Sequence, residues 1–118
     1  MKCQVNVLLL TVVLVQSAIT GPGHQVALVG SSLSLTCTTD AMKEVCWEYY
    51  PNHASIPRTI YTGRRVNRQY RGTHQVAEKG NGTVTLTLVR VKLHDAGMYQ
   101  CRECTTIHLV DIEVTVLG

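Results

Sequence analysis

After its first twenty residues, the sequence lacks any apolar run long enough to cross a membrane, since a spanning helix needs roughly 20 apolar residues. It also lacks an internal repeat, a low-complexity tract, a linker and any segment with a convincing helical period. The formal net charge of +3, which falls by one if Lys2 is removed, is too small to indicate a nucleic-acid partner by itself. These absences predict a soluble, non-helical chain with no membrane span and no specific nucleic-acid partner.

A catalytic constellation is lacking as well. None of the histidines is spaced with a serine, a cysteine or a carboxylate in the way that nucleophilic catalysis requires. We interpret all five as surface residues: His24, His53, His74, His94 and His108. The sequence therefore predicts a binding or structural protein rather than an enzyme, with no cofactor and no metal site.

The first twenty residues are typical of a secretory signal peptide. A positive start at Lys2 precedes an apolar stretch over residues 5–15, and small residues follow over 16–20. Two cleavage sites fit, after Ser17 or after Thr20, and the residues alone do not decide between them. We expect residues 1–20 to be removed and residues 21–118, one domain's worth of chain, to be secreted.

The cysteines of the mature chain indicate disulfides. Removal of the signal peptide leaves an even number, which in an exported chain favours paired thiols; they are Cys37, Cys46, Cys101 and Cys104. The alternative is that the Cys-Arg-Glu-Cys run at 101–104 is a redox or zinc motif. A redox motif begins a helix, yet no helical pattern follows. Two residues three apart on a strand point to opposite faces and do not converge on one metal ion.

Strands account for most of residues 21–118. Residues 31–37, 83–88 and 110–116 alternate apolar with polar side chains, the period of a strand with one buried face. Turn residues separate these runs, at Gly30, Gly63 and Gly80–Gly82. Residues 51–75 are the least regular part. The chain is predicted to be all-β.

Three features together resemble the immunoglobulin V-set pattern. Cys37 ends a strand, Trp47 follows ten residues later, and residues 95–101 read Asp-Ala-Gly-Met-Tyr-Gln-Cys. The resemblance implies an immunoglobulin-like, V-type, two-sheet antiparallel sandwich. It implies a Cys37–Cys101 bridge between the sheets with Trp47 packed against it, and a Tyr99 hydroxyl bonded to nearby backbone.

Residues 81–88 and 94–101 narrow the resemblance further. They are similar to the triggering receptors expressed on myeloid cells, and more loosely to the polymeric-immunoglobulin-receptor group. This similarity implies an innate-immune receptor that binds ligands with its B–C, C′–C″ and F–G loops. Two departures stand out: the C′ region has no cysteine, and no stalk or transmembrane segment follows. We therefore expect a soluble or truncated form.

The second cysteine pair follows from strand parity. If Trp47 faces the core, Cys46 faces outward; if Cys101 faces the core, Cys104 faces outward as well. The two strands are neighbours in V-set domains. We expect the register to set Cys46 opposite Cys104, with β-carbons about 4.5–5.5 Å apart, near the reach of a disulfide. This bridge would stiffen the base of the F–G loop.

Basic side chains gather before residue 72. No acidic residue interrupts them, and the five are Arg58, Arg64, Arg65, Arg68 and Arg71. We expect Arg64, Arg65 and Arg68 to contact a protein ligand or an anionic lipid or glycan, because guanidinium groups suit phosphate, sulfate and carboxylate. The alternative is a solvated sheet edge, where charge discourages aggregation.

An internal ion pair is a further expectation. V domains commonly pair an arginine with the aspartate before the strand of the second cysteine, and Arg71 has a suitable separation from Asp95. Arg68 is the reserve candidate. We therefore assign Asp95 and Arg71 to the core together with Trp47 and Tyr99.

Two surface features complete the sequence. Asn81-Gly-Thr is a glycosylation sequon in a turn, and we expect it to be occupied in a secreted chain. The second functional hypothesis is assembly, in which the outer face of the sheet with strands G, F, C and C′ pairs with another V domain. The outward disulfide and Glu48 would alter the shape and polarity of that face.

Overall fold

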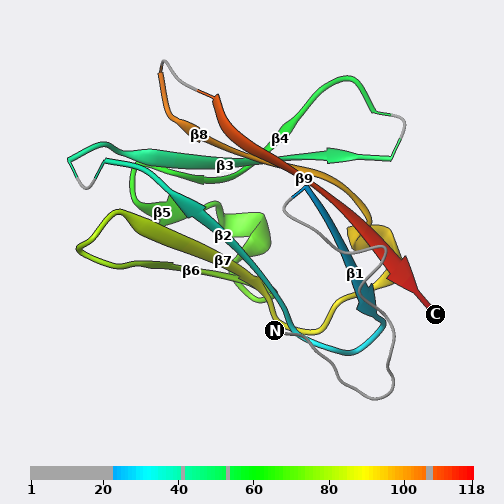
Figure 1. Ribbon diagram of the computed structural model, residues 1–118. Helices are drawn as coiled ribbons and strands as arrows, with labels where there is room; N and C mark the ends of the chain where they lie inside the picture. The colour runs from blue at the N-terminus through cyan, green and yellow to red at the C-terminus, as the bar shows by residue number, and fades with distance from the viewer. Residues whose placement is uncertain (1–22, 41, 53, 106–107) are drawn as a thin grey trace.

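The computed structural model describes residues 23–40, 42–52, 54–105 and 108–118 (Figure 1). The signal peptide that we expect over residues 1–20 lies outside the described residues, as does His53. Within the described part, no helix has the length and apolar character needed to span a membrane.

Two β-sheets pack face to face (Figure 1). The larger sheet has the order β1-β9-β8-β3-β4-β5 and the smaller has the order β2-β7-β6. The strands are β1 His24–Leu28, β2 Leu33–Thr38, β3 Val45–Pro51, β4 Arg58–Thr62, β5 Arg65–Val66, β6 His74–Glu78, β7 Thr83–Leu88, β8 Gly97–Glu103 and β9 His108–Leu117. Two short 3-10 helices, η1 Arg68–Tyr70 and η2 Leu93–Asp95, precede β6 and β8. The all-β immunoglobulin-like sandwich is confirmed.

Alternating side chains explain the smaller sheet. In β2 and β7 every second residue is buried, and Leu35 lies opposite Leu86 in the antiparallel register. The intervening polar residues form cross-strand hydroxyl pairs on the outer face, such as Ser34 with Thr87 at 3.0 Å. The predicted alternation over residues 31–37 and 83–88 is therefore confirmed.

One strand pair departs from the antiparallel sandwich that we expected. β1 runs parallel to β9, with His24 opposite Glu113 and Leu28 opposite Leu117. After β1 the chain turns at Gly30, whose φ of +90° suits glycine, and enters β2 of the other sheet. Because β1 is not joined to β9 by a hairpin, parallel pairing is open to it.

The core is organised around the bridge between the sheets. Cys37 of β2 and Cys101 of β8 form a disulfide with an S–S distance of 2.09 Å. Trp47 lies directly opposite Cys101 in the β3–β8 register and is fully buried. Packing of this indole beside the bridge removes both from water and fixes the spacing of the two layers.

Two tyrosines hold the start of β8. The Tyr99 hydroxyl donates to the carbonyl of Asp95 at 2.6 Å, which is the predicted tyrosine corner. The Tyr49 hydroxyl lies 2.8 Å from the carbonyl of His94 and 2.6 Å from that of Ala96, and the two tyrosine rings stack with centroids 4.6 Å apart. Burial raises the pKa of Tyr99, and it raises the pKa of Tyr49 to about 12, so both hydroxyls stay protonated and donate.

The predicted Arg71–Asp95 pair is wrong. Asp95 uses its Oδ2 atom to accept from the backbone N–H of Lys92 at 2.8 Å, which caps η2. Arg71 is exposed, and its Nε donates to the carbonyl of Val66 at 3.2 Å. Neither ion pair found among the described residues involves Arg71 or Arg68. The Asp95 carboxylate accepts a hydrogen bond within its own turn and makes no ion pair with Arg71, so the two residues are not partners within the core.

His74 is the basic residue that stands near Asp95 instead. We expected a surface histidine, but His74 begins β6 and is only 5% exposed. Its Nδ1 lies 2.7 Å from the Thr73 hydroxyl, and its ring meets the Tyr70 ring edge-on. Burial lowers the pKa of His74, and the nearby Asp95 carboxylate opposes that shift only in part.

Gly97 provides a test of the β3–β8 packing. Its φ is +145°, and a β-carbon there would lie 2.4 Å from the carbonyl oxygen of Tyr50. We expect Gly97→Ala to lower the free energy of unfolding by at least about 3 kcal/mol, because backbone strain and overpacking add. Gly72→Ala is the matched control, since nothing lies within 4 Å of a β-carbon at Gly72. Equal urea midpoints for the two variants would contradict this packing.

His74 makes stability depend on pH. Its pKa is lowered in the folded state, so as pH falls below about 6.5 the unfolded chain takes up a proton that the folded chain resists. The free energy of unfolding should therefore reach its full value near pH 7.5 and fall toward pH 5, with His74 contributing at most about 1.4 kcal/mol per pH unit. His74→Gln should flatten the urea-unfolding profile, whereas His94→Gln, at an exposed position, should keep it. An unchanged slope in His74→Gln would show that this ring is not responsible.

Candidate functional site

Four connections lie at one end of the sandwich, toward the left of Figure 1. They are the β2–β3 connection, the β4–β5 turn, the β6–β7 turn and the β8–β9 connection, and we call this end the loop end. Hydrogen bonds join the β2–β3 connection to the end of β8 and the residue after it: the Cys104 N–H donates to the carbonyl of Glu44 at 3.1 Å, and the Thr39 hydroxyl donates to Glu103 at 2.6 Å. Glu103 is 9% exposed, so this carboxylate is shielded where it fixes the β2–β3 connection. Nothing in the sequence pattern singled it out.

The β4–β5 turn is the most regular part of the loop end. Thr62 lies opposite Arg65, which leaves Gly63 and Arg64 as the two turn residues, each with a φ of +59°. Positive φ at both central residues is the signature of a type I′ hairpin turn. The turn that Gly63 predicts is confirmed, and both Arg64 and Arg65 are exposed.

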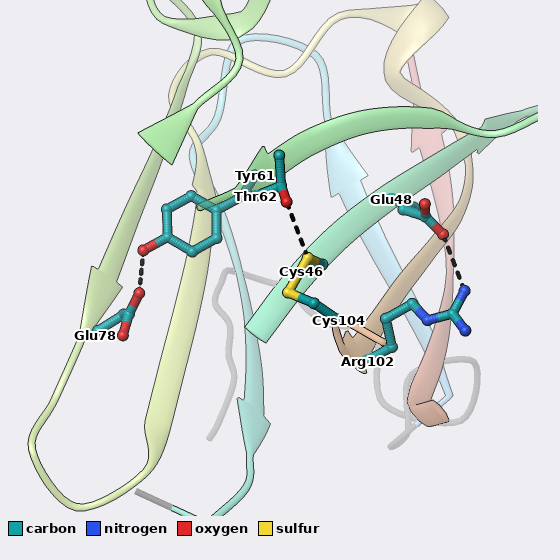
Figure 2. Close-up of a disulfide and its surroundings, with 7 residues drawn as sticks. All are labelled: Cys46, Glu48, Tyr61, Thr62, Glu78, Arg102 and Cys104. Carbon is teal, nitrogen blue, oxygen red and sulfur yellow. Dashed lines mark hydrogen bonds and ion pairs between the residues drawn. A yellow bond between two sulfur atoms is a disulfide. The ribbon is translucent and has the colours of Figure 1, made fainter. Parts of the chain in front are cut away.

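Arg64 has an acidic neighbour that the sequence did not reveal. Its guanidinium lies 3.4 Å from Glu78, at the end of β6 in the other sheet. Tyr61 of β4 also donates to Glu78, as Figure 2 shows, and burial together with this bond raises the pKa of Tyr61. The side chain of Arg64 is nevertheless 63% exposed. Its charge is therefore only partly offset, and Glu78 ties the two sheets together at the loop end.

The five arginines do not form one cluster. Arg58 begins β4 and therefore lies at the end of that strand away from the turn. Arg68 begins η1, beyond β5, in the crossover toward β6. Of the predicted ligand residues, the structure places Arg64 and Arg65 at the loop end and does not place Arg68 beside them. A short hairpin and a crossover separate residues that are close in sequence.

The second disulfide also lies at the loop end (Figure 2). Cys46 and Cys104 are joined with an S–S distance of 2.07 Å and α-carbons 4.9 Å apart. The register that we expected is wrong: with Trp47 opposite Cys101, Cys46 faces Arg102. β8 ends at Glu103, and the turn that follows brings Cys104 back toward Cys46. The Thr62 hydroxyl lies 3.3 Å from Cys46 Sγ, and since a disulfide sulfur carries no proton, this hydroxyl is the donor.

The Cys-Arg-Glu-Cys run is therefore divided between two bridges. Cys101 lies in the core and Cys104 at the surface, each with a different partner. Among the described residues, no group of three or more histidine, cysteine or acidic side chains is arranged to hold a metal ion.

Asn81 occupies the turn between β6 and β7. Its side chain is exposed, and its Oδ1 accepts from the Thr83 N–H at 3.1 Å. The sequon is thus presented on the surface in a compact turn, with Glu78 at the end of the preceding strand.

The outer face of the larger sheet carries paired polar side chains beside Tyr50 and Met98, which lie opposite each other in β3 and β8 and are partly exposed. Arg102 pairs with Glu48 at 3.6 Å across β8 and β3 (Figure 2), and Gln100 donates to Asp111 at 3.1 Å across β8 and β9. The Nε atom of Arg102 is buried without a hydrogen-bond partner, so the polar groups of this face are only partly satisfied within the chain.

The architecture agrees with a sequence comparison. The family model of the immunoglobulin V-set domain matches residues 20–115. No curated protein matches the sequence of this chain. V-set domains act in general as extracellular recognition domains that bind partners rather than transform substrates. With most of its length covered by that match, this chain belongs to the immunoglobulin V-set family.

Proposed function

We propose that this chain is the extracellular recognition domain of an innate-immune receptor, and that it binds an anionic or protein ligand at its loop end. Secretion would follow removal of residues 1–20, with cleavage after Ser17 or Thr20. The similarity of residues 81–88 and 94–101 to the triggering receptors expressed on myeloid cells supports the receptor type.

One observation carries the proposal: the Cys46–Cys104 disulfide fixes the chain at Cys104, just after β8, next to the exposed β4–β5 turn with its two arginines. Thr62, the residue before that turn, contacts Cys46 directly. A ligand surface that is already ordered loses less entropy on binding than a mobile loop does. The bridge therefore favours recognition at this end.

Charge supports the same location. Arg65 is exposed, and neither ion pair among the described residues uses it. Arg64 is largely exposed beside it despite its contact with Glu78. Two adjacent guanidinium groups can each donate paired hydrogen bonds to a phosphate, sulfate or carboxylate group.

Dimerisation through the outer face of the larger sheet is the other hypothesis. The polar side chains of that face are already paired, Arg102 with Glu48 and Gln100 with Asp111. A second copy would have to desolvate these groups without offering them better partners. We therefore place recognition at the loop end ahead of assembly; light scattering of the purified chain would reveal a dimer directly.

Charge reversal at the turn tests the proposal. The probes are vesicles containing phosphatidylserine, and heparin. We expect Arg65→Glu to weaken binding to at least one of them about tenfold, equivalent to about 1.4 kcal/mol, and the parent's binding to weaken steeply with salt, since screening acts over about 8 Å at physiological ionic strength. The melting temperature should stay within about two degrees because the side chain is exposed.

Arg90→Glu is the matched control, with the same change of charge at an exposed residue that follows β7 at the opposite end of the sandwich. An equal loss in both variants would indicate unspecific attraction to the whole surface. Binding that survives Arg65→Glu undiminished would move recognition to the neighbouring connections.

Removal of the second disulfide tests the role of rigidity. We expect a variant with both Cys46→Ala and Cys104→Ala to fold, because the Cys37–Cys101 bridge remains, and to lose about 2–4 kcal/mol of stability. Amide hydrogen exchange at residue 104 should accelerate, since its bond to Glu44 loses support, while exchange at residue 101 should change little. Peptide mapping of the parent should find no free thiol. Unaltered exchange at residue 104 would show that the bridge does not hold this connection.

A further inference from the structure

A hollow of about 440 Å³ lies at the end of the sandwich opposite the loop end. Two lining residues, Arg58 and His74, are the first residues of β4 and β6. Both strands run toward the loop end, where β4 leads into the β4–β5 turn and β6 ends at Glu78, so the hollow lies at their opposite ends. η2 closes the hollow just before β8, the strand that runs away from it to Glu103. This site is therefore separate from the loop end.

The hollow has a basic rim. Arg58 and Lys92 line it and are exposed, and so is His94. Neither ion pair among the described residues uses Arg58 or Lys92. The carboxylate in the lining, Asp95, already accepts a hydrogen bond from the backbone of Lys92. The hollow is thus lined by the charged side chains of Arg58 and Lys92, and the one carboxylate in its lining already accepts a hydrogen bond.

Aromatic rings form the walls of the hollow. Tyr49 is held by stacking on Tyr99 and by its hydroxyl contacts to the backbone around η2. Tyr70 of η1 packs edge-on against the His74 ring, with centroids 5.0 Å apart. Both tyrosines line the space; Tyr49 is only 5% exposed, so the partly exposed Tyr70 ring is the apolar surface that a ligand would meet. The volume falls in the range of about 300–1,000 Å³ that is usual for small-molecule sites.

We propose that this hollow binds an acidic sugar unit, a monosaccharide or disaccharide that carries a carboxylate or a sulfate group. The acidic group would bind Arg58 and Lys92 by charge-assisted hydrogen bonds. The sugar ring would lie against the ring of Tyr70, which offers the flat apolar face and polar edge that suit a pyranose. The site stands independently of recognition at the loop end.

Titration of the isotopically labelled folded protein, followed by amide NMR, tests the proposal. The probes are N-acetylneuraminic acid for the carboxylate class and a sulfated heparin disaccharide for the sulfate class, with neutral lactose as the reference. We expect one acidic probe or both to shift the amides of Arg58, Tyr70 and Lys92 at millimolar concentration, and lactose to leave them in place.

Matched variants separate this site from the loop end. Arg58→Gln and Lys92→Gln, each made singly, should weaken binding of the acidic probe at least fivefold, whereas Arg65→Gln should leave it within twofold. Two variants are used so that a folding defect in one, judged by its melting temperature, does not remove the test. Three results would overturn the proposal: no shifts with either acid, equal shifts with lactose, or shifts at Arg64 and Arg65 in place of the hollow. A negative result for the hollow would not affect the prediction that vesicles or heparin bind at Arg65, so the two proposals are tested independently.

Discussion

The rest of the structure depends on the register that sets Trp47 opposite Cys101. The inter-sheet bridge to Cys37 ties this register to the smaller sheet, so the pairing of β3 with β8 cannot slip by one residue without expelling the indole from the core. The same register stacks Tyr49 on Tyr99 at one end and sets Cys46 opposite Arg102 near the other. Both ends of the domain are therefore positioned by a single contact in the middle.

The two ends are held by different means. At the loop end, covalent and ionic links cross between elements: the second disulfide, and the contacts of Glu78 with Tyr61 and Arg64. At the opposite end, buried tyrosine hydroxyls bind backbone carbonyls around η2, and close packing at Gly97 leaves no room for a side chain. The loop end can vary its exposed residues without disturbing the core, whereas the opposite end has little tolerance around η2.

The sandwich and the tyrosine corner were predicted from the resemblance of Cys37, Trp47 and residues 95–101 to the V-set pattern. The alternation of β2 and β7 was predicted from the local period of two in the sequence. Relations between distant segments were predicted less well. The alternation of side chains along β3 and β8 correctly placed Cys46 and Cys104 on the same side of the sheet. It did not show that β8 ends at Glu103, so the residue predicted opposite Cys46 was wrong. The Arg71–Asp95 pair failed because the carboxylate caps its own turn. Glu78 was missed because β6 brings it to Tyr61 and Arg64 of the other sheet. His74 was expected on the surface, but it is buried where β6 begins.

The shortness of β5 has a consequence for how partners can approach. A sheet edge with unpaired backbone groups is a template on which an extended peptide can add as a further strand. On this side the larger sheet ends in a strand of two residues, Arg65–Val66, and the chain then leaves the sheet at η1. So short an edge, with a charged residue on it, offers too few hydrogen bonds to recruit another strand. Partners on this flank must therefore engage side chains rather than the backbone, which makes selectivity there a matter of side-chain chemistry.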